Sequence, residues 1–60
     1  MNRKKLLREI AKLGARFKRH GGGHDMYTDG VKSIPVPRHA EIDEQTANDI
    51  IKFFSKDYST

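Results

Sequence analysis

Residues 24–36 read HDMYTDGVKSIPV, and this stretch decides the fold that the sequence predicts. Two short runs rich in β-branched and aromatic residues flank the dipeptide Asp29-Gly30, over residues 24–28 and 31–36. Asp-Gly between two such runs is the strongest short-range signal of a β-hairpin, so the sequence predicts two antiparallel strands joined by a tight turn. Because Pro35 cannot donate a hydrogen bond to a neighbouring strand, we expect the second strand of the hairpin either to lie at an edge of the sheet or to end at Pro35.

A further strand is predicted immediately before the hairpin, over residues 15–20. Apolar Ala15 and Phe17 alternate there with Arg16, Lys18 and His20, as is typical of a half-buried strand. Three consecutive glycines, Gly21, Gly22 and Gly23, connect this strand to the hairpin. Such a triplet permits positive φ angles in a loop, and its N–H groups can also cradle a phosphate.

Helical periodicity flanks the strands on both sides. Within residues 2–13, Leu6, Ile10 and Leu13 follow the i, i+4, i+7 spacing of one helix face. Asn2 is the expected N-cap of this helix and Gly14 the residue just beyond its end. After residue 43 the helical spacing returns at Ala47, Ile50, Ile51 and Phe54, with Asp43 as the expected N-cap.

The predicted fold is therefore α+β, in the order α-β-β-β-α, and residues 1–60 form a single domain. A three-stranded antiparallel sheet with both helices on one face buries the apolar positions and leaves the other face open to solvent. A chain of this length buries only about 60% of its unfolded surface, so its core is marginal. The expected core residues are Leu6, Ile10, Leu13, Phe17, Ile34, Val36, Ala47, Ile50 and Phe54.

Composition excludes several classes of protein. The chain has no cysteine, which excludes disulfides and thiolate zinc sites. No apolar run approaches the roughly 20 residues of a membrane span, and no secretory signal is present, so we expect a cytoplasmic protein. The spacing of the three histidines and Asp25 fits no closed zinc pattern. We therefore expect no metal ion and no cofactor.

The basic residues are concentrated at one end of the chain. Residues 1–20 hold eight Lys and Arg against one Glu, a formal charge of +7, whereas residues 40–60 hold two Lys against five acids, a charge of −3. A basic surface of this kind attracts polyanions such as RNA without reading their sequence. The alternative is a solvated surface that only keeps a small protein in solution.

His24 follows the glycine triplet and begins a predicted strand. An imidazole titrates near neutral pH and suits proton transfer, so His24 next to basic strands suggests cleavage of RNA. One histidine fills one proton-transfer role and leaves the second group unidentified. A surface histidine without catalytic function is the alternative. The His24 side chain lies on the open face of the sheet if Tyr27 is a core residue, and on the helix side if Met26 is a core residue.

Other side chains around His24 are expected to contact the nucleic acid. The candidate cations are Arg16, Lys18, Arg19 and Lys32, which would bind phosphate and stabilise charge during cleavage. Tyr27 is expected to stack on a base or donate a proton. For His39 we expect a structural role, with its ring bonded to a backbone group ahead of the last helix.

Seven residues carry a resemblance to the HicA family, small bacterial toxins of toxin–antitoxin pairs. They are Gly22, His24, Tyr27, Gly30, Val36, Pro37 and His39, set between a basic helix and an acid-capped helix. The resemblance implies a fold like that of double-stranded-RNA-binding domains, cleavage of messenger RNA, catalysis by His24 and neutralisation by a HicB-type antitoxin. Many members carry serine immediately before this histidine, where the present chain has Gly23.

Two other functional classes remain open at this point. A non-catalytic RNA-binding module of the double-stranded-RNA-binding type would have the same fold and the same basic surface, but would tolerate loss of His24. A small interaction domain that binds another protein through its acidic second helix is the third hypothesis.

Overall fold

The computed structural model describes residues 1–55, which form two helices and three strands. They follow one another as α1 (Arg3–Ala11), β1 (Arg16–His20), β2 (His24–Thr28), β3 (Ser33–Pro37) and α2 (Glu44–Phe54). The predicted order α-β-β-β-α is therefore confirmed. The strand predicted over residues 24–28 has those bounds, whereas α1, β1 and β3 begin or end one or two residues from their predicted bounds. Within the described residues, neither helix has the length and apolar character needed to cross a membrane.

Both helices begin at the caps that the sequence predicts. The Asn2 side chain accepts hydrogen bonds from the first-turn amides of α1, and the Asp43 side chain does the same for α2. Gly14, just beyond α1, has a φ of 94°, a conformation that favours glycine. The cap residues thus fix where each helix starts, and Gly14 turns the chain from α1 into β1.

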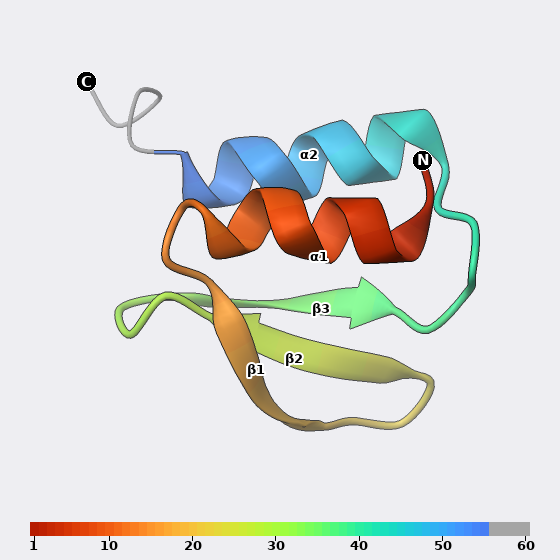
Figure 1. The fold of residues 1–60 in the computed structure, drawn as a ribbon. Coiled ribbons are helices and arrows are strands. Elements are labelled where there is room, and N and C mark those ends of the chain that lie inside the picture. Colours follow the sequence, from red (N-terminus) through yellow and green to blue (C-terminus); the bar gives the residue numbers. More distant parts are fainter. Residues whose placement is uncertain (56–60) are drawn as a thin grey trace.

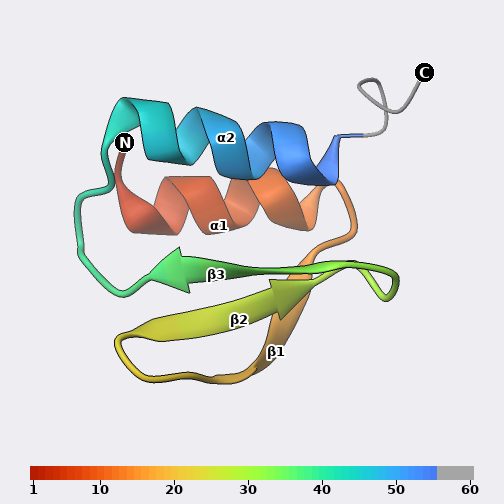
Figure 2. The same cartoon turned by 180° about the vertical axis from the view of Figure 1, so that it is seen from behind.

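The three strands form one antiparallel sheet in the order β1-β2-β3. Both helices lie side by side on one side of this sheet, and β1 runs away from them along its length (Figures 1 and 2). The edge position predicted for Pro35 is confirmed because β3 is a terminal strand of the sheet. The other face carries no helix and is open.

The connection between β2 and β3 is wider than the two-residue turn that the sequence predicts. Thr28 pairs with Ser33, so residues 29–32 form a four-residue loop and Val31 lies outside the strand, 92% exposed. Asp29 closes this loop, because its side chain accepts hydrogen bonds from the backbone N–H groups of Val31 and Lys32 at 2.9 Å each. Gly30 supplies the positive φ of 97° that the loop requires.

A β-bulge interrupts the pairing of β1 with β2. Phe17 pairs with Tyr27 and Arg19 pairs with Met26, so Lys18 is an extra residue on β1. A bulge bends its strand and changes which face the following side chains occupy.

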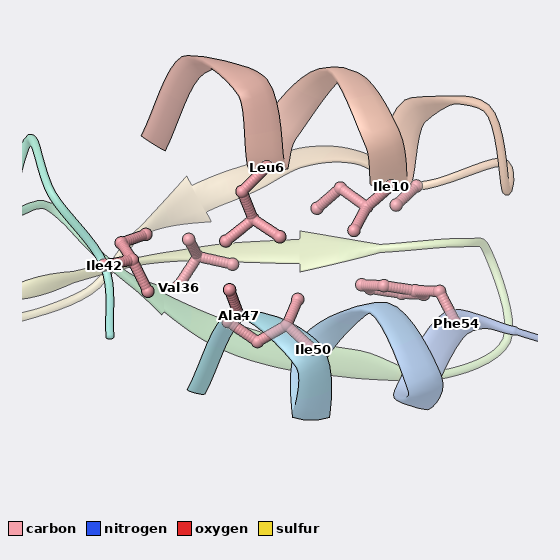
Figure 3. Packing of buried hydrophobic residues seen from close by; sticks show 8 residues of the cluster. Leu6, Ile10, Val36, Ile42, Ala47, Ile50 and Phe54 are labelled. Atoms are coloured by element: carbon pink, nitrogen blue, oxygen red, sulfur yellow. The ribbon is translucent and has the colours of Figure 1, made fainter. Parts of the chain in front are cut away.

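The core fills the space between the helices and the sheet (Figure 3). Its buried side chains come from both helices, β3 and the segments beside them: Leu6, Ile10, Ala15, Val36, Ile42, Ala47, Ile50 and Phe54. Leu13 and Ile34 are only partly buried against this cluster. Phe17 was predicted as a core residue, and this prediction is wrong because 46% of its surface is exposed. Phe17 is exposed because it lies on β1, the edge strand that runs away from the helices and is not covered by them.

Candidate functional site

His24 lies on the open face of the sheet. Asp25, the next residue, pairs with the fully buried Val36 and contacts Arg3 of α1, so Asp25 and Tyr27 point to the helix side. Because side chains alternate along a strand, His24 and Met26 point to the opposite side. The His24 side chain is exposed and makes no hydrogen bond within residues 1–55. Its two ring nitrogens are therefore open to a ligand.

Three cationic side chains share this face with His24. Residues directly opposite each other in a sheet lie on one face, which places Arg16 beside Thr28 and Arg19 beside Met26. Lys18 reaches the same face, since its Nζ lies 3.5 Å from the hydroxyl of Ser33, the partner of Thr28. We call the set Arg16, Lys18, Arg19 and His24 the basic face.

The charges of the basic face are not neutralised by the protein. Arg16, Lys18 and Arg19 are exposed, and within the described part of the chain none of them forms an ion pair. Lys18 and Arg19 are consecutive in the chain, and without the bulge two consecutive side chains would point to opposite faces. The bulge at Lys18 therefore increases the positive charge on the face that carries His24.

Two of the expected contact residues lie elsewhere. Tyr27 is half-buried on the helix side, where it packs against the core and forms an edge-on ring contact with Phe17 at 5.9 Å. Lys32 is in the loop at the far end of the β2–β3 hairpin from His24, and its Nζ lies 5.1 Å from the ring centre of Phe53. Of the expected cations, Arg19 lies nearest to His24, because its pairing partner Met26 is two residues from His24 on the same face. Arg16, opposite Thr28, and Lys18, whose Nζ reaches Ser33, lie on this face toward the loop that carries Lys32. Tyr27 lies on the other side of the sheet.

The glycine loop before His24 is closed by two short backbone hydrogen bonds. The Gly21 N–H donates to the His24 carbonyl at 2.7 Å, and the His24 N–H donates to the Gly22 carbonyl at 2.8 Å. None of the three glycines has a positive φ, so the expected use of positive φ in this loop is wrong. A Cβ on Gly23 would meet no atom within 4 Å, so a small side chain such as serine would fit at this position.

Asp25 is the polar residue of this region that sequence reasoning did not find. Only 9% of its surface is exposed. Its Oδ2 accepts from Arg3 Nη2 at 2.9 Å, and its Oδ1 lies 2.9 Å from His20 Nδ1 and 3.0 Å from Arg38 Nε. The hydrogen bond with His20, and after it that with Arg38, lowers the pKa of Asp25 below its usual value of 3.8 although burial opposes this. Asp25 is therefore a carboxylate at neutral pH.

The remaining histidines have different surroundings from those of His24. His20 is held by Asp25, whose Oδ1 lies 2.9 Å from His20 Nδ1. His39 is exposed and makes no hydrogen bond within the described residues, so the expected bond to the backbone is absent. Among residues 1–55 no three His, Cys, Asp or Glu side chains are grouped so that they could hold a metal ion.

Comparison with known proteins identifies the family. A sequence profile described as "HicA toxin of bacterial toxin-antitoxin" matches residues 3–53, from the first turn of α1 almost to the end of α2. The chain therefore belongs to the HicA family, the toxin components of bacterial toxin–antitoxin systems. Membership implies a cognate antitoxin. No curated protein and no solved structure gives a significant match to the chain.

Proposed function

We propose that this HicA-family toxin is a metal-independent endoribonuclease that cleaves messenger RNA, with His24 as the catalytic acid or base. The single observation that supports it best is the exposed, unbonded imidazole of His24 on the same face as Arg16, Lys18 and Arg19. Exposed cations without ion-pair partners attract a phosphate backbone regardless of its sequence. An imidazole on the same face is the group needed for proton transfer near neutral pH.

The proposed reaction uses the RNA as its own nucleophile. The ribose 2′-oxygen attacks the adjacent phosphorus, the bond from phosphorus to the 5′-oxygen breaks, and the products are a 2′,3′-cyclic phosphate and a 5′-hydroxyl. His24 either accepts the proton of the 2′-hydroxyl or donates one to the departing 5′-oxygen, and water exchanges the other proton. Arg19, whose pairing partner Met26 is the next residue after His24 on this face, stabilises the developing negative charge.

Metal removal and a DNA substrate test this chemistry together. Because the 2′-hydroxyl supplies the nucleophile, we expect the purified protein to cleave RNA at an unchanged rate in excess EDTA. DNA of the same sequence lacks this hydroxyl and should remain intact. Gel analysis of both substrates, with and without chelator, is the measurement. Loss of RNA cleavage in EDTA and its recovery with magnesium would contradict the mechanism, and cleavage of DNA would contradict the substrate class.

The antitoxin of this toxin is proposed to be of the HicB type and to cover the basic face. A standard interface removes roughly 800 Å² per partner, about a fifth of the toxin's 4139 Å² of accessible surface. An inhibitor that blocks RNA need only occupy His24 and the three cations, and acidic or carbonyl groups would replace the phosphates there.

Competition between RNA and antitoxin tests where inhibition occurs. We expect antitoxin to displace a labelled, non-cleavable RNA from the toxin, and we expect the affinity of the toxin–antitoxin pair to fall as salt is added. Fluorescence anisotropy at two ionic strengths measures both. If saturating antitoxin abolishes cleavage and leaves RNA bound, inhibition acts at a surface other than the basic face.

A further inference from the structure

Asp25 connects four segments of the chain that are far apart in sequence. Its carboxylate contacts Arg3 at the start of α1, His20 at the end of β1 and Arg38 just after β3, and Asp25 itself lies near the start of β2. All of these contacts lie on the helix side of the sheet, whereas the side chain of the neighbouring His24 lies on the open face. We call these four residues the Asp25 clamp.

The cations of the clamp also bind backbone atoms around His24. Arg3 Nε donates to the Pro37 carbonyl at 2.8 Å, and Pro37 is the residue that pairs with His24 across β2 and β3. Arg38 Nη2 donates to the Gly21 carbonyl at 3.1 Å. Gly21 in turn donates its N–H to the His24 carbonyl at 2.7 Å. The backbone of His24 is thus held from the strand beside it and from the glycine loop.

We propose that Asp25 is a positioning residue for the catalytic site: with Arg3, His20 and Arg38 it fixes the backbone that presents His24 on the opposite face. This proposal rests on the proposed ribonuclease function. Asp25 points away from the basic face, so it positions His24 without touching the RNA. A loop with three glycines loses much conformational freedom when it is ordered, and the clamp supplies the contacts that order it.

A carboxylate is the group that this position requires. It offers two oxygens and a full negative charge to three donors, and charge-assisted hydrogen bonds are shorter and stronger than neutral ones. Arg3 is 20% exposed, and removing its charged partner would leave the guanidinium half-buried without a counter-ion. An amide in place of Asp25 keeps the shape of the side chain but offers only one acceptor oxygen and no charge.

The test compares Asp25→Asn with Asp29→Asn. Both substitutions remove one negative charge and keep the size of the side chain, but Asp29 closes the loop at the other end of the hairpin and contacts no member of the clamp. For Asp25→Asn we expect kcat on RNA to fall by up to about 100-fold, because a small misplacement of a catalytic group is costly, with KM unchanged. For Asp29→Asn we expect kcat and KM to equal those of the wild-type protein.

Amide hydrogen exchange gives a second measurement that does not depend on activity. We expect the Gly21 amide, which bonds to the His24 carbonyl, to exchange faster in Asp25→Asn than in the wild-type protein or in Asp29→Asn. Arg38→Gln serves if Asp25→Asn does not fold, because the Arg38 side chain is 49% exposed and its loss removes the bonds to both Asp25 and Gly21. For Arg38→Gln we expect the same faster Gly21 exchange and lower kcat as for Asp25→Asn, but with smaller changes.

The outcomes separate the clamp from the proposed function. Faster Gly21 exchange together with reduced kcat supports the proposal. Unchanged exchange, unchanged kcat, or a change in KM alone overturns it. If the wild-type protein cleaves no RNA, the proposed function fails, and the exchange comparison alone then decides whether Asp25 orders the loop.

Discussion

Replacing His24 by alanine is expected to reduce RNA cleavage to background and to abolish the growth arrest that we expect from expression of the wild-type toxin. General acid–base catalysis by one side chain contributes about 10²- to 10⁴-fold in rate, and no other unbonded histidine lies on the basic face. The fold should be unaffected, because the His24 side chain is exposed and makes no hydrogen bond in the described part of the chain. Binding of RNA should persist through Arg16, Lys18 and Arg19.

His39→Ala is the matched control for this experiment. His39 is also exposed, also lacks a hydrogen bond within residues 1–55, and lies outside the basic face. Cleavage of a defined RNA is measured with purified proteins, and transcript integrity is followed in cells after induction. Cleavage by the His24 variant at the wild-type rate would refute catalysis by His24. RNA binding without cleavage by the wild-type protein would instead favour a non-catalytic RNA-binding module.

Replacing Phe54 by alanine is expected to have the largest effect on stability. Phe54 is 1% exposed and lies between α1, α2 and the sheet (Figure 3). Truncating a buried phenylalanine costs about 3–5 kcal/mol. A domain of this length has a total free energy of unfolding of roughly 3–9 kcal/mol, so a large fraction of the variant should be unfolded at 37 °C.

Phe17→Ala provides the comparison, since it removes the same atoms from an exposed position. We expect it to cost about 1 kcal/mol or less, because 46% of Phe17 already contacts solvent. Urea unfolding followed by circular dichroism measures both variants. Equal losses of stability would mean that β1 packs against the helices in solution, which would contradict the position of Phe17 described above.

Local sequence signals were sufficient to predict most of the fold. The N-caps Asn2 and Asp43, the hairpin around Gly30 and the edge position of Pro35 depend on residues within a few positions of one another. Phe17 was assigned to the core because it alternates with charged residues. That pattern identifies one face of a strand and does not show how far the helices extend over it.

The site was predictable only in part, for a related reason. His24 is identified by its chain neighbours, but the face it occupies depends on whether Met26 or Tyr27 contacts the helices. The Asp25 clamp joins residues 13 and 22 positions apart. Such contacts form only when the sheet has formed, so no local pattern in a single sequence predicts them.

The bulge at Lys18 also affects whether a strand of another chain can pair with the edge of this sheet. Strand edges with unpaired backbone groups invite further strands, and bulges, charges and prolines prevent such additions. β1 carries the bulge and consecutive basic side chains, while β3 carries Pro35 and Pro37, which have no N–H to donate. Neither edge strand is therefore a good template for pairing with another strand. Both edge strands are thereby protected against edge-to-edge pairing with another chain.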